Sequence, residues 1–360
     1  MNPYKSLEER AFWAPSVGRR HMLDISDLWR PQFKINAKSK ISTFGSCFAQ
    51  HFSRALVKRG FTWFDGEPAP IGLSEQDTVR FNYGVFSART GNMYTTSLLL
   101  QWTNWALEQS VPPDEVWEKG GRFFDPFRPQ IEPDGFASRE EVLVSRNLCI
   151  AAFRRAILVA DTFVFTLGLT ESWWNADLGY EYPVCPGAVA EEFSHPSHEF
   201  RNQEYPQIQQ NLLQAISLMR KQNRGLRFLL TVSPVPLTAT NSGNHVLVAT
   251  MDSKSRLRAV AGQIARTVQR VDYFPSYEII NAPPFRGMFF EPNQRNVNRS
   301  GVDFVMKSFF EGLGLRSVSA AAAPEEPEPK PKRGRKSAAD LVCEEEMLAA
   351  FGPGSAARNT

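Results

Sequence analysis

The stretch KISTFGSCFAQHFSRALVKRG, residues 40–60, passes from one local pattern to another through a tight turn. Residues 40–44 are rich in β-branched and aromatic side chains, which indicates a strand, and the apolar spacing over 47–59 indicates a helix. Ser46, Cys47 and His51 all lie in or just after the turn between them. A strand that turns directly into a helix is a repeating unit of α/β folds, so the chemistry of this turn depends on the fold around it.

Further strand-like runs follow at intervals along the chain. Helical patterns or long insertions separate these runs, which favours parallel strands joined by crossover helices. We therefore expect an α/β fold with helices on both faces of a parallel sheet. The expected strands are KISTF (40–44), DTFVFTL (161–167), RFLLTVS (227–233) and the weaker YEII (277–280), and the expected helices are 47–59, 141–158, 205–223 and 251–269.

Composition limits the class of protein. The chain has 360 residues, 42% of them hydrophobic, which is enough to bury the core of one large domain or two smaller ones. Its formal charge of +3 is too balanced to indicate a surface that wraps nucleic acid. No CxxC pair occurs among the cysteines, which argues against a zinc cage or disulfide framework and favours a reducing cytoplasm. The chain shows neither the apolar core of a signal peptide nor a run of about 18 apolar residues that could span a membrane.

Three segments are expected: an N-terminal extension over 1–39, a domain over 40–316 and a tail over 317–360. Within the domain, residues 101–138 form an irregular, aromatic-rich insertion. This insertion is interpreted either as a cap above the strand ends or as a surface loop packed by its own side chains. Its aromatic residues include Trp102, Trp105, Trp117, Phe123, Phe124 and Phe127.

The tail over 317–360 is rich in Ala, Pro, Glu and Lys. We expect it to be disordered, because it has too little apolar area to offset the entropy of ordering. KRGRK (332–336) resembles an AT-hook, but such basic islands are common in solvated linkers, so nucleic acid is not an expected partner. Leu348 and Phe351, three positions apart, predict one short amphipathic turn that could dock transiently.

Six sequence blocks occur in a set order along the domain: GSCFA (45–49), FNYGVFSARTGN (81–92), TLGLTESW (166–173), TVSPVPL (231–237), SKSRLRAV (253–260) and YFPSYEII (273–280). Their order and spacing resemble the GSCFA family, a branch related to the SGNH, or GDSL-like, hydrolases. The resemblance covers roughly residues 40–310. It implies a three-layer α/β/α sandwich and ester chemistry at a serine, with an acyl group passed to water or to another hydroxyl.

The resemblance also implies roles for particular residues. Ser46 would be the nucleophile, and the oxyanion would be held by its own amide or that of Cys47, by the amide of Gly84 and by a polar group of the third block. That block has no asparagine at the usual place, so Thr170 or a backbone N–H beside Glu171 would donate instead. The structural alternatives are that Ser46 and Thr170 are helix caps and that Gly84 provides a left-handed turn.

Cys47 is a second candidate nucleophile, since a helix N-terminus lowers the pKa of a thiol. Its side chain should point about 100° around the helix from Ser46. We therefore expect Cys47 to pack against the sheet, as cysteines outside disulfides often do.

The general base is missing from its expected place. The family pattern implies Asp-x-x-His on the loop after the last strand, but Asn293 and Asn296 stand there, and neither amide is a useful base. His51 falls about 140° from Ser46 on the same helix. His198 and His245 are the leading substitutes, with a solvated loop histidine as the ordinary alternative for each.

Carboxylates are another route to a base, because burial can raise the pKa of an acid towards neutrality. Glu171, Glu278 and Glu291 stand at predicted strand ends or in the final loop, although surface ion pairing is the ordinary explanation for each. No metal or cofactor is expected. HPSH (195–198) has no third ligand of matching spacing, and no GxGxxG or GxxxxGK[ST] motif occurs.

Two functions follow from the sequence. The first is a serine-dependent acyl-ester hydrolase or O-acyltransferase that acts on an acylated small molecule or glycan in the cytoplasm. The second is a non-catalytic binding protein that kept the crevice and lost the Asp-x-x-His dyad.

Overall fold

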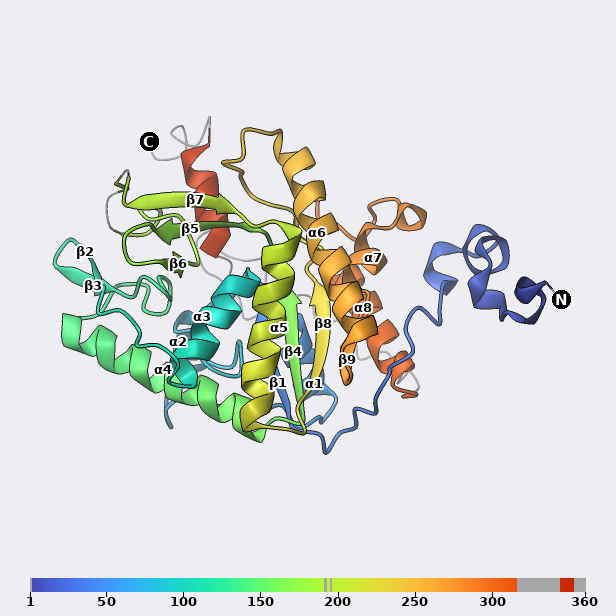
Figure 1. The fold of residues 1–360 in the computed structure, drawn as a ribbon, viewed down its shortest axis with the longest axis horizontal. Helices are drawn as coiled ribbons and strands as arrows, with labels where there is room; N and C mark the ends of the chain where they lie inside the picture. Colours follow the sequence, from blue (N-terminus) through green and yellow to red (C-terminus); the bar gives the residue numbers. More distant parts are fainter. Residues whose placement is uncertain (1, 191–192, 195, 316–343, 353–360) are drawn as a thin grey trace.

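The computed structural model describes residues 2–190, 193–194, 196–315 and 344–352. Its centre is a four-stranded parallel sheet in the order β1-β4-β8-β9 (Figure 1). The strands are β1 (Ile41–Gly45), β4 (Thr162–Leu167), β8 (Arg227–Val232) and β9 (Val271–Tyr273). Non-consecutive neighbours in a parallel sheet require crossover connections, which the helices between the strands supply.

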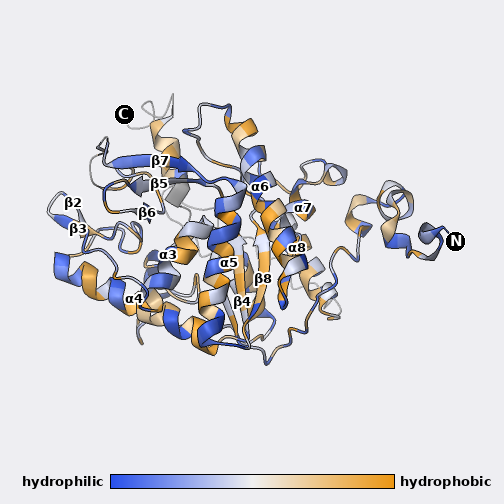
Figure 2. Cartoon of the chain, viewed as in Figure 1, coloured by the Kyte–Doolittle hydropathy of each residue, from blue (hydrophilic) through white to orange (hydrophobic). Residues whose placement is uncertain are grey.

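The central strands are buried on both faces, and their side chains alternate between two hydrophobic cores. In β4, Phe163 and Phe165 pack in one core and Val164 packs in the other. In β8, Leu230 and Leu229 divide in the same way. Figure 2 shows these two strands in largely hydrophobic colours, while α4 and α5 mix both colours along their length. Period-two alternation between two covered faces is what a sheet in the middle layer requires.

Helices cover both faces of the sheet, so the expected three-layer α/β/α arrangement is confirmed. The core with Phe163 and Phe165 also holds residues of α3 (Thr96–Ala106), α4 (Arg139–Val159), α5 (Tyr205–Gln222) and α6 (Val246–Thr267). The core with Val164 holds residues of α1 (Ala49–Lys58), α7 (Ser276–Asn281) and α8 (Arg299–Gly312). The short α2 (Glu75–Arg80) has no buried residue.

Three of the four predicted strands are confirmed, but the fourth is wrong. YEII (277–280) lies within α7, and the fourth strand is β9, a few residues earlier. Ser276, Ile279 and Ile280 are the buried residues of α7, and their spacing of three and four is helical. A run of four residues, of which three are apolar or aromatic, is too short to separate a strand from one helical turn. The helix expected from residue 251 also begins earlier, at Val246.

The aromatic-rich insertion joins the main core, so it is neither a cap nor a separate loop. Trp102 contacts Phe153 of α4, with ring centroids 6.2 Å apart, and Trp105 contacts Phe127 at 4.9 Å. The rest of the insertion contains a hairpin of β2 (Trp117–Lys119) and β3 (Arg122–Phe124).

A second, antiparallel sheet lies beyond the carboxyl ends of the parallel strands (Figure 1). Its order is β6-β5-β7, formed by β5 (Glu171–Asn175), β6 (Tyr180–Tyr182) and β7 (His198–Asn202). β5 begins four residues after β4 ends, so this small sheet continues directly from the parallel one.

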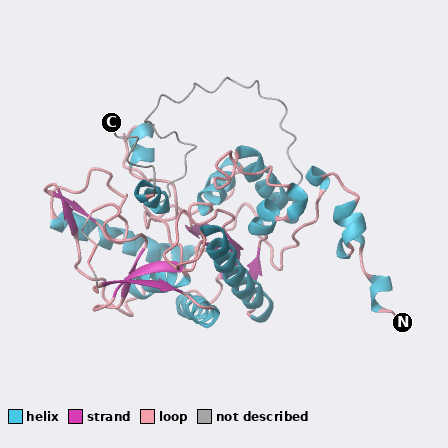
Figure 3. Cartoon of the chain, turned by 90° about the horizontal axis from the view of Figure 1, so that it is seen from above, coloured by secondary structure: helices cyan, strands magenta, loops and turns pink. Residues whose placement is uncertain are grey.

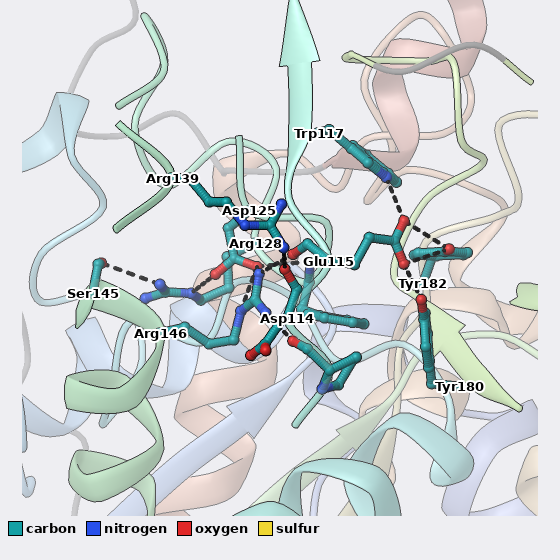
Figure 4. Close-up of polar contacts among 12 residues, drawn as sticks. Asp114, Glu115, Trp117, Asp125, Arg128, Arg139, Ser145, Arg146, Tyr180 and Tyr182 are labelled. Atoms are coloured by element: carbon teal, nitrogen blue, oxygen red, sulfur yellow. Dashed lines mark hydrogen bonds and ion pairs between the residues drawn. The ribbon is translucent and has the colours of Figure 1, made fainter. Parts of the chain in front are cut away.

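A buried ion cluster joins the insertion to α4 (Figure 4). The Asp125 carboxylate accepts hydrogen bonds from Arg128 Nε at 2.7 Å and Arg146 Nε at 3.1 Å, and all three side chains are buried. Burial alone would raise the pKa of Asp125, but the Arg146 and Arg128 guanidinium groups outweigh it and hold the pKa below its usual value. Beside this cluster, Glu115 accepts hydrogen bonds from Trp117 Nε1 and from the Tyr182 hydroxyl, each at 2.9 Å.

The N-terminal extension contributes to the core only in its second half. Ile25, Trp29 and Ile35 are buried, and Trp29 stacks on Phe309 of α8 at 5.4 Å. Earlier residues lie away from the body in Figures 1 and 3. The short helices of the chain are η1 (Pro3–Ser6), η2 (Glu9–Ala11), η3 (Ala14–Gly18), η4 (Met22–Asp24), η5 (Pro283–Phe285) and η6 (Glu344–Phe351).

Several predictions concern residues that the structure does not describe. KRGRK (332–336), Cys343, His195 and the expected disorder over most of the tail lie outside the described residues. None of the helices in the described part of the chain combines the length and apolar character that crossing a bilayer requires.

Candidate active site

Gly45 determines how β1 enters the turn. Its φ is +127°, and a Cβ at this position would lie 2.3 Å from the carbonyl oxygen of Thr166 on β4. Only glycine fits so close an approach of two backbones at a positive φ. The next amide, Ser46 N–H, donates to the same Thr166 oxygen at 3.0 Å, so it is already committed to the sheet. Ser46 therefore stands at the carboxyl edge of the sheet, the edge at which such folds usually bind their ligands.

The hydroxyl of Ser46 is not a helix cap. The N-cap of α1 is Phe48, which makes no side-chain capping bond, and Ser46 contributes its carbonyl oxygen to Ala49 N at 2.8 Å. Ser46 is 2% exposed, and its Oγ has no hydrogen-bond partner among the described residues. Leaving a buried hydroxyl unsatisfied costs about 1–3 kcal/mol. Such an exception calls for an explanation, and a functional site is one of the places where it occurs.

Gly168 and Tyr94 form the wall next to this serine. A Cβ built on Gly168 would lie 3.0 Å from Ser46 Cβ and 3.0 Å from Tyr94 Cδ1. Ser46 and the Tyr94 ring therefore both pack against Gly168. Tyr94 is held by its carbonyl oxygen, which accepts the N–H groups of Gly168 at 2.8 Å and Leu169 at 3.1 Å.

The residues just after the second sequence block lie between the ends of β1 and β4, where the two strands stop pairing. Met93 N–H donates to the carbonyl oxygen of Gly45 at 2.9 Å, which places the preceding residue, Asn92, beside the same strand end. Asn92 is 2% exposed. A side-chain amide can donate a hydrogen bond to an oxyanion. Asn92 could therefore take the role that the family pattern gives to an asparagine of the third block. Asn92 belongs to the same sequence block as Gly84, but only Gly84 was predicted as an oxyanion donor.

Lys254 is the second residue that sequence reasoning missed. It is buried on α6, and its Nζ donates to the carbonyl oxygen of Gly168 at 2.5 Å. The neighbouring Ser253 Oγ accepts the N–H of Thr170 at 3.1 Å, so α6 fixes the whole loop after β4. A signal was present in the sequence: Lys254 precedes the buried Leu257 by three positions and Ala261 by seven, on the apolar stripe of its helix.

The predicted oxyanion residues are placed differently from one another. Cys47 is buried in the core that also contains Phe48, which confirms its interpretation as a packing residue. The Thr170 hydroxyl donates to Asn202 Oδ1 at 2.7 Å, which commits it to β7. Gly84 lies in an exposed turn with φ +68°, the left-handed conformation that was its structural alternative. Its oxyanion role stays a prediction.

The candidate carboxylates have structural partners. Glu171 is buried beneath the β8–α6 loop, where it accepts Thr240 Oγ1 at 2.6 Å and Asn241 N–H at 3.3 Å. Glu278 accepts the Tyr273 hydroxyl at 2.8 Å and forms an ion pair with Arg258. Glu291 is exposed in the final loop.

The structure does not bring the predicted histidines to the serine. His198 Nδ1 accepts Ser194 N–H at 3.1 Å, and His198 stands four residues along β7 from Asn202, about 13 Å at the usual strand rise. His245 is exposed and caps α6 by accepting Leu247 N–H at 3.2 Å. Burial, with a smaller effect of Arg54, lowers the pKa of His51 to about 3.

The two asparagines that replace the dyad are turn residues. Asn293 Oδ1 accepts the N–H groups of Arg295 at 3.0 Å and Asn296 at 2.9 Å, and Asn296 Oδ1 accepts Arg295 Nη1 at 3.4 Å. These contacts use the amides to close the final loop, as short polar side chains commonly do.

Glu181, on strand β6 of the small sheet, is a buried acid. Glu181 accepts the hydroxyls of Thr95, at 2.5 Å, and of Ser97, both at the start of α3. Burial raises the pKa of Glu181 to about 7, against the opposing effect of these hydroxyls. Glu181 thus joins β6 to the helix that follows Tyr94.

A cavity of about 730 Å³ is lined in part by Tyr94. Its walls come from Tyr94 itself, the small sheet, the loop over 183–188, the β8–α6 loop and the C-terminal helix η6. Cys185 lies in this wall, and burial raises the pKa of its thiol to about 11. The lining is mainly apolar and aromatic, and Glu171 is the one acidic side chain among the described residues that line it.

No curated protein matches this sequence. The model of the GSCFA family matches residues 40–309, which is three quarters of the chain and includes the whole of the parallel sheet. The chain therefore belongs to the GSCFA family.

Proposed function

We propose that this protein is a serine-dependent acyl-ester hydrolase or O-acyltransferase acting on an acylated small molecule or glycan, with the chemistry of the SGNH hydrolases. One observation carries the proposal. Ser46 stands at the carboxyl edge of the parallel sheet with a buried Oγ that makes no hydrogen bond to any described residue. The ordinary use of such a serine, as the cap of α1, is ruled out by the position of the cap at Phe48.

Lys254 is our candidate for the missing base. Its Nζ is bonded to the carbonyl oxygen of Gly168, the glycine against which Ser46 packs. Serine and lysine form nucleophile and base in known variants of the triad, and Lys254 is buried beside the loop that packs on Ser46. In the described part of the chain, neither a histidine nor Lys254 is hydrogen-bonded to Ser46 Oγ, so Nζ has to leave the Gly168 carbonyl oxygen to take the serine proton.

The proposed reaction has two steps. As Ser46 Oγ attacks the ester carbonyl carbon, its proton passes to Lys254 Nζ, and Nζ then gives a proton to the departing alcohol oxygen. In the second step, water or a second hydroxyl loses its proton to Nζ and attacks the acyl carbon, and Ser46 Oγ regains a proton as it leaves. Amide donors near the strand ends, at Cys47 N–H and Asn92, would hold the oxyanion.

A fluorophosphonate probe tests the nucleophile. We expect labelling at Ser46, mapped by peptide mass spectrometry, and loss of both labelling and hydrolysis of p-nitrophenyl esters in Ser46→Ala. Hydrolysis that persists undiminished in Ser46→Ala would remove this mechanism.

Two variants test the base. Lys254→Met preserves the length of the buried stem, and Lys254→Arg preserves the charge while preventing proton loss. Both should lower kcat/KM by roughly 10²–10⁴, the usual contribution of a general base. A matched control is Lys307→Met on α8, where the lysine is exposed. Turnover by Lys254→Arg at the wild-type rate would exclude Lys254 as the base.

A non-catalytic binding protein is the second candidate. Asn293 and Asn296 favour it, because these amides close a turn where the dyad would stand. It predicts ligand binding that Ser46→Ala leaves unchanged, together with no turnover of any ester in a panel.

A further inference from the structure

The cavity lined in part by Tyr94 has the size and lining of a site for an apolar group. Its volume of about 730 Å³ lies within the range of small-molecule pockets, roughly 300–1,000 Å³. Leu169, Trp173, Phe200 and Leu237 contribute apolar surface. Glu171 is already satisfied there by Thr240 and Asn241. A pocket with so few polar groups would bind mainly by burying hydrocarbon.

The cavity is adjacent to the proposed nucleophile. Tyr94 lines the cavity, and its ring and Ser46 Cβ pack around the same position at Gly168. Leu169, the next residue, also lines the cavity. A chain extending from a carbonyl held at Ser46 would therefore meet this apolar space after passing one aromatic ring.

The C-terminal helix η6 forms one wall of the cavity. Leu348 and Phe351 line it, and in Figure 1 this red helix lies beside β5 and β7. Glu346 forms an ion pair with Arg295 Nη1 at 3.2 Å, while Arg295 Nε donates to the carbonyl oxygen of Pro236 at 3.1 Å. Pro236 directly precedes Leu237, another lining residue, so Arg295 links η6 to the β8–α6 loop.

η6 leaves apolar surface uncovered. Phe351 is 66% exposed although it borders a hydrophobic cavity. Exposed aromatic surface at the mouth of an apolar site gains free energy when a ligand covers it. η6 lines the cavity but does not fill its volume of about 730 Å³. The helix is therefore placed to cover a bound molecule.

We propose that this cavity binds the unbranched hydrocarbon chain of an acyl group and that Glu344–Phe351 is a lid closing over that chain. The assignment to the acyl group of an ester rests on the proposed function. The binding of hydrocarbon beneath the lid does not, because it requires no chemistry at Ser46.

Binding can be measured without turnover. The probe is 2-dodecanone, a ketone with no ester bond, which should displace the fluorescent dye N-phenyl-1-naphthylamine from the full-length protein carrying Ser46→Ala. We expect displacement at micromolar ketone. The cavity-filling variant Ala188→Trp should abolish it, because Ala188 lines the cavity. Failure of 2-dodecanone to bind, or binding that Ala188→Trp leaves unchanged, would overturn the assignment.

The lid is tested by removing its apolar side chains. The double variant Leu348→Ser, Phe351→Ser should weaken ketone binding about tenfold or more, since two side chains would lose their contact with the hydrocarbon. Ile71→Ser is the matched control, because Ile71 is fully exposed in another loop. Equal affinity in the double variant and the control would show that η6 is no lid.

Cys185 provides an independent reporter inside the wall. Its alkylation by iodoacetamide at alkaline pH should accelerate severalfold in the double lid variant and slow when 2-dodecanone is bound. Peptide mapping separates this thiol from Cys343. Alkylation at an unchanged rate in both conditions would contradict the lid.

The outcomes separate the two proposals. If 2-dodecanone binds under the lid but Ser46 takes no fluorophosphonate, the hydrocarbon site stands and the ester chemistry fails. If Ser46 is labelled and turns over short esters, while the ketone never enters the cavity, the chemistry stands and this inference fails.

Discussion

Replacing Asp125 with asparagine should destabilise the protein strongly. The substitution preserves the size of the side chain and removes the carboxylate that pairs with both Arg128 and Arg146, which are both buried. Two guanidinium groups would then remain in the interior around a neutral amide. Breaking a buried ion pair by removing one partner costs about 3–5 kcal/mol. Since domains of this kind unfold at about 5–15 kcal/mol, the loss is a large share of the total.

Urea unfolding followed by far-ultraviolet circular dichroism measures this cost. Asp134→Asn is the matched control, because Asp134 pairs with Arg80 at an exposed site, where an ion pair contributes roughly 0–1 kcal/mol. The difference between wild type and Asp125→Asn should also shrink in acid. The pKa of Asp125 is lowered in the folded protein, so its stabilisation is full above the usual carboxyl pKa and is lost as pH falls through the folded value. A cost at neutral pH equal to that of Asp134→Asn would refute this reasoning.

Three further predictions follow from other buried groups. Glu181→Gln should flatten the pH dependence of stability. With a pKa of about 7 in the folded wild type, Glu181 keeps its proton on folding, so the free energy of unfolding falls by up to about 3 kcal/mol as pH rises from 5 to above 7. Urea unfolding at several pH values measures this change. Gly168→Ala should slow the labelling of Ser46 by fluorophosphonate, because the new methyl group crowds Ser46 and Tyr94. The same crowding should lower the free energy of unfolding by about 1–3 kcal/mol. Trp29→Ala should cost about 3–5 kcal/mol in thermal unfolding, whereas deletion of residues 2–18, which have no buried residue, should cost little.

The sequence predicted the parallel sheet well because each of its long strands is a continuous apolar run between helical patterns. It failed where the local run was too short to carry a period, as in YEII, which became a turn of α7. It also did not predict the small sheet of β5, β6 and β7, whose short strands mix polar with aromatic residues.

The candidate site was predictable only in part. Ser46 and the packing of Cys47 followed from the strand, turn and helix around them. Lys254 could not be linked to Ser46 from sequence, because their proximity depends on a contact between α6 and the loop after β4 across 86 residues. The search for a histidine also directed attention to His198 and His245, whose loops are positioned by contacts that no local pattern records.

The pair of glycines around Ser46 has a consequence for how the gene can vary. Gly45 admits no Cβ without colliding with Thr166, and Gly168 admits one only at the expense of Ser46 and Tyr94. Every single-nucleotide missense change of a glycine codon introduces a Cβ. A saturation library selected for function should therefore be depleted at both codons as strongly as at the serine codon, although neither glycine has a side chain that could take part in any reaction.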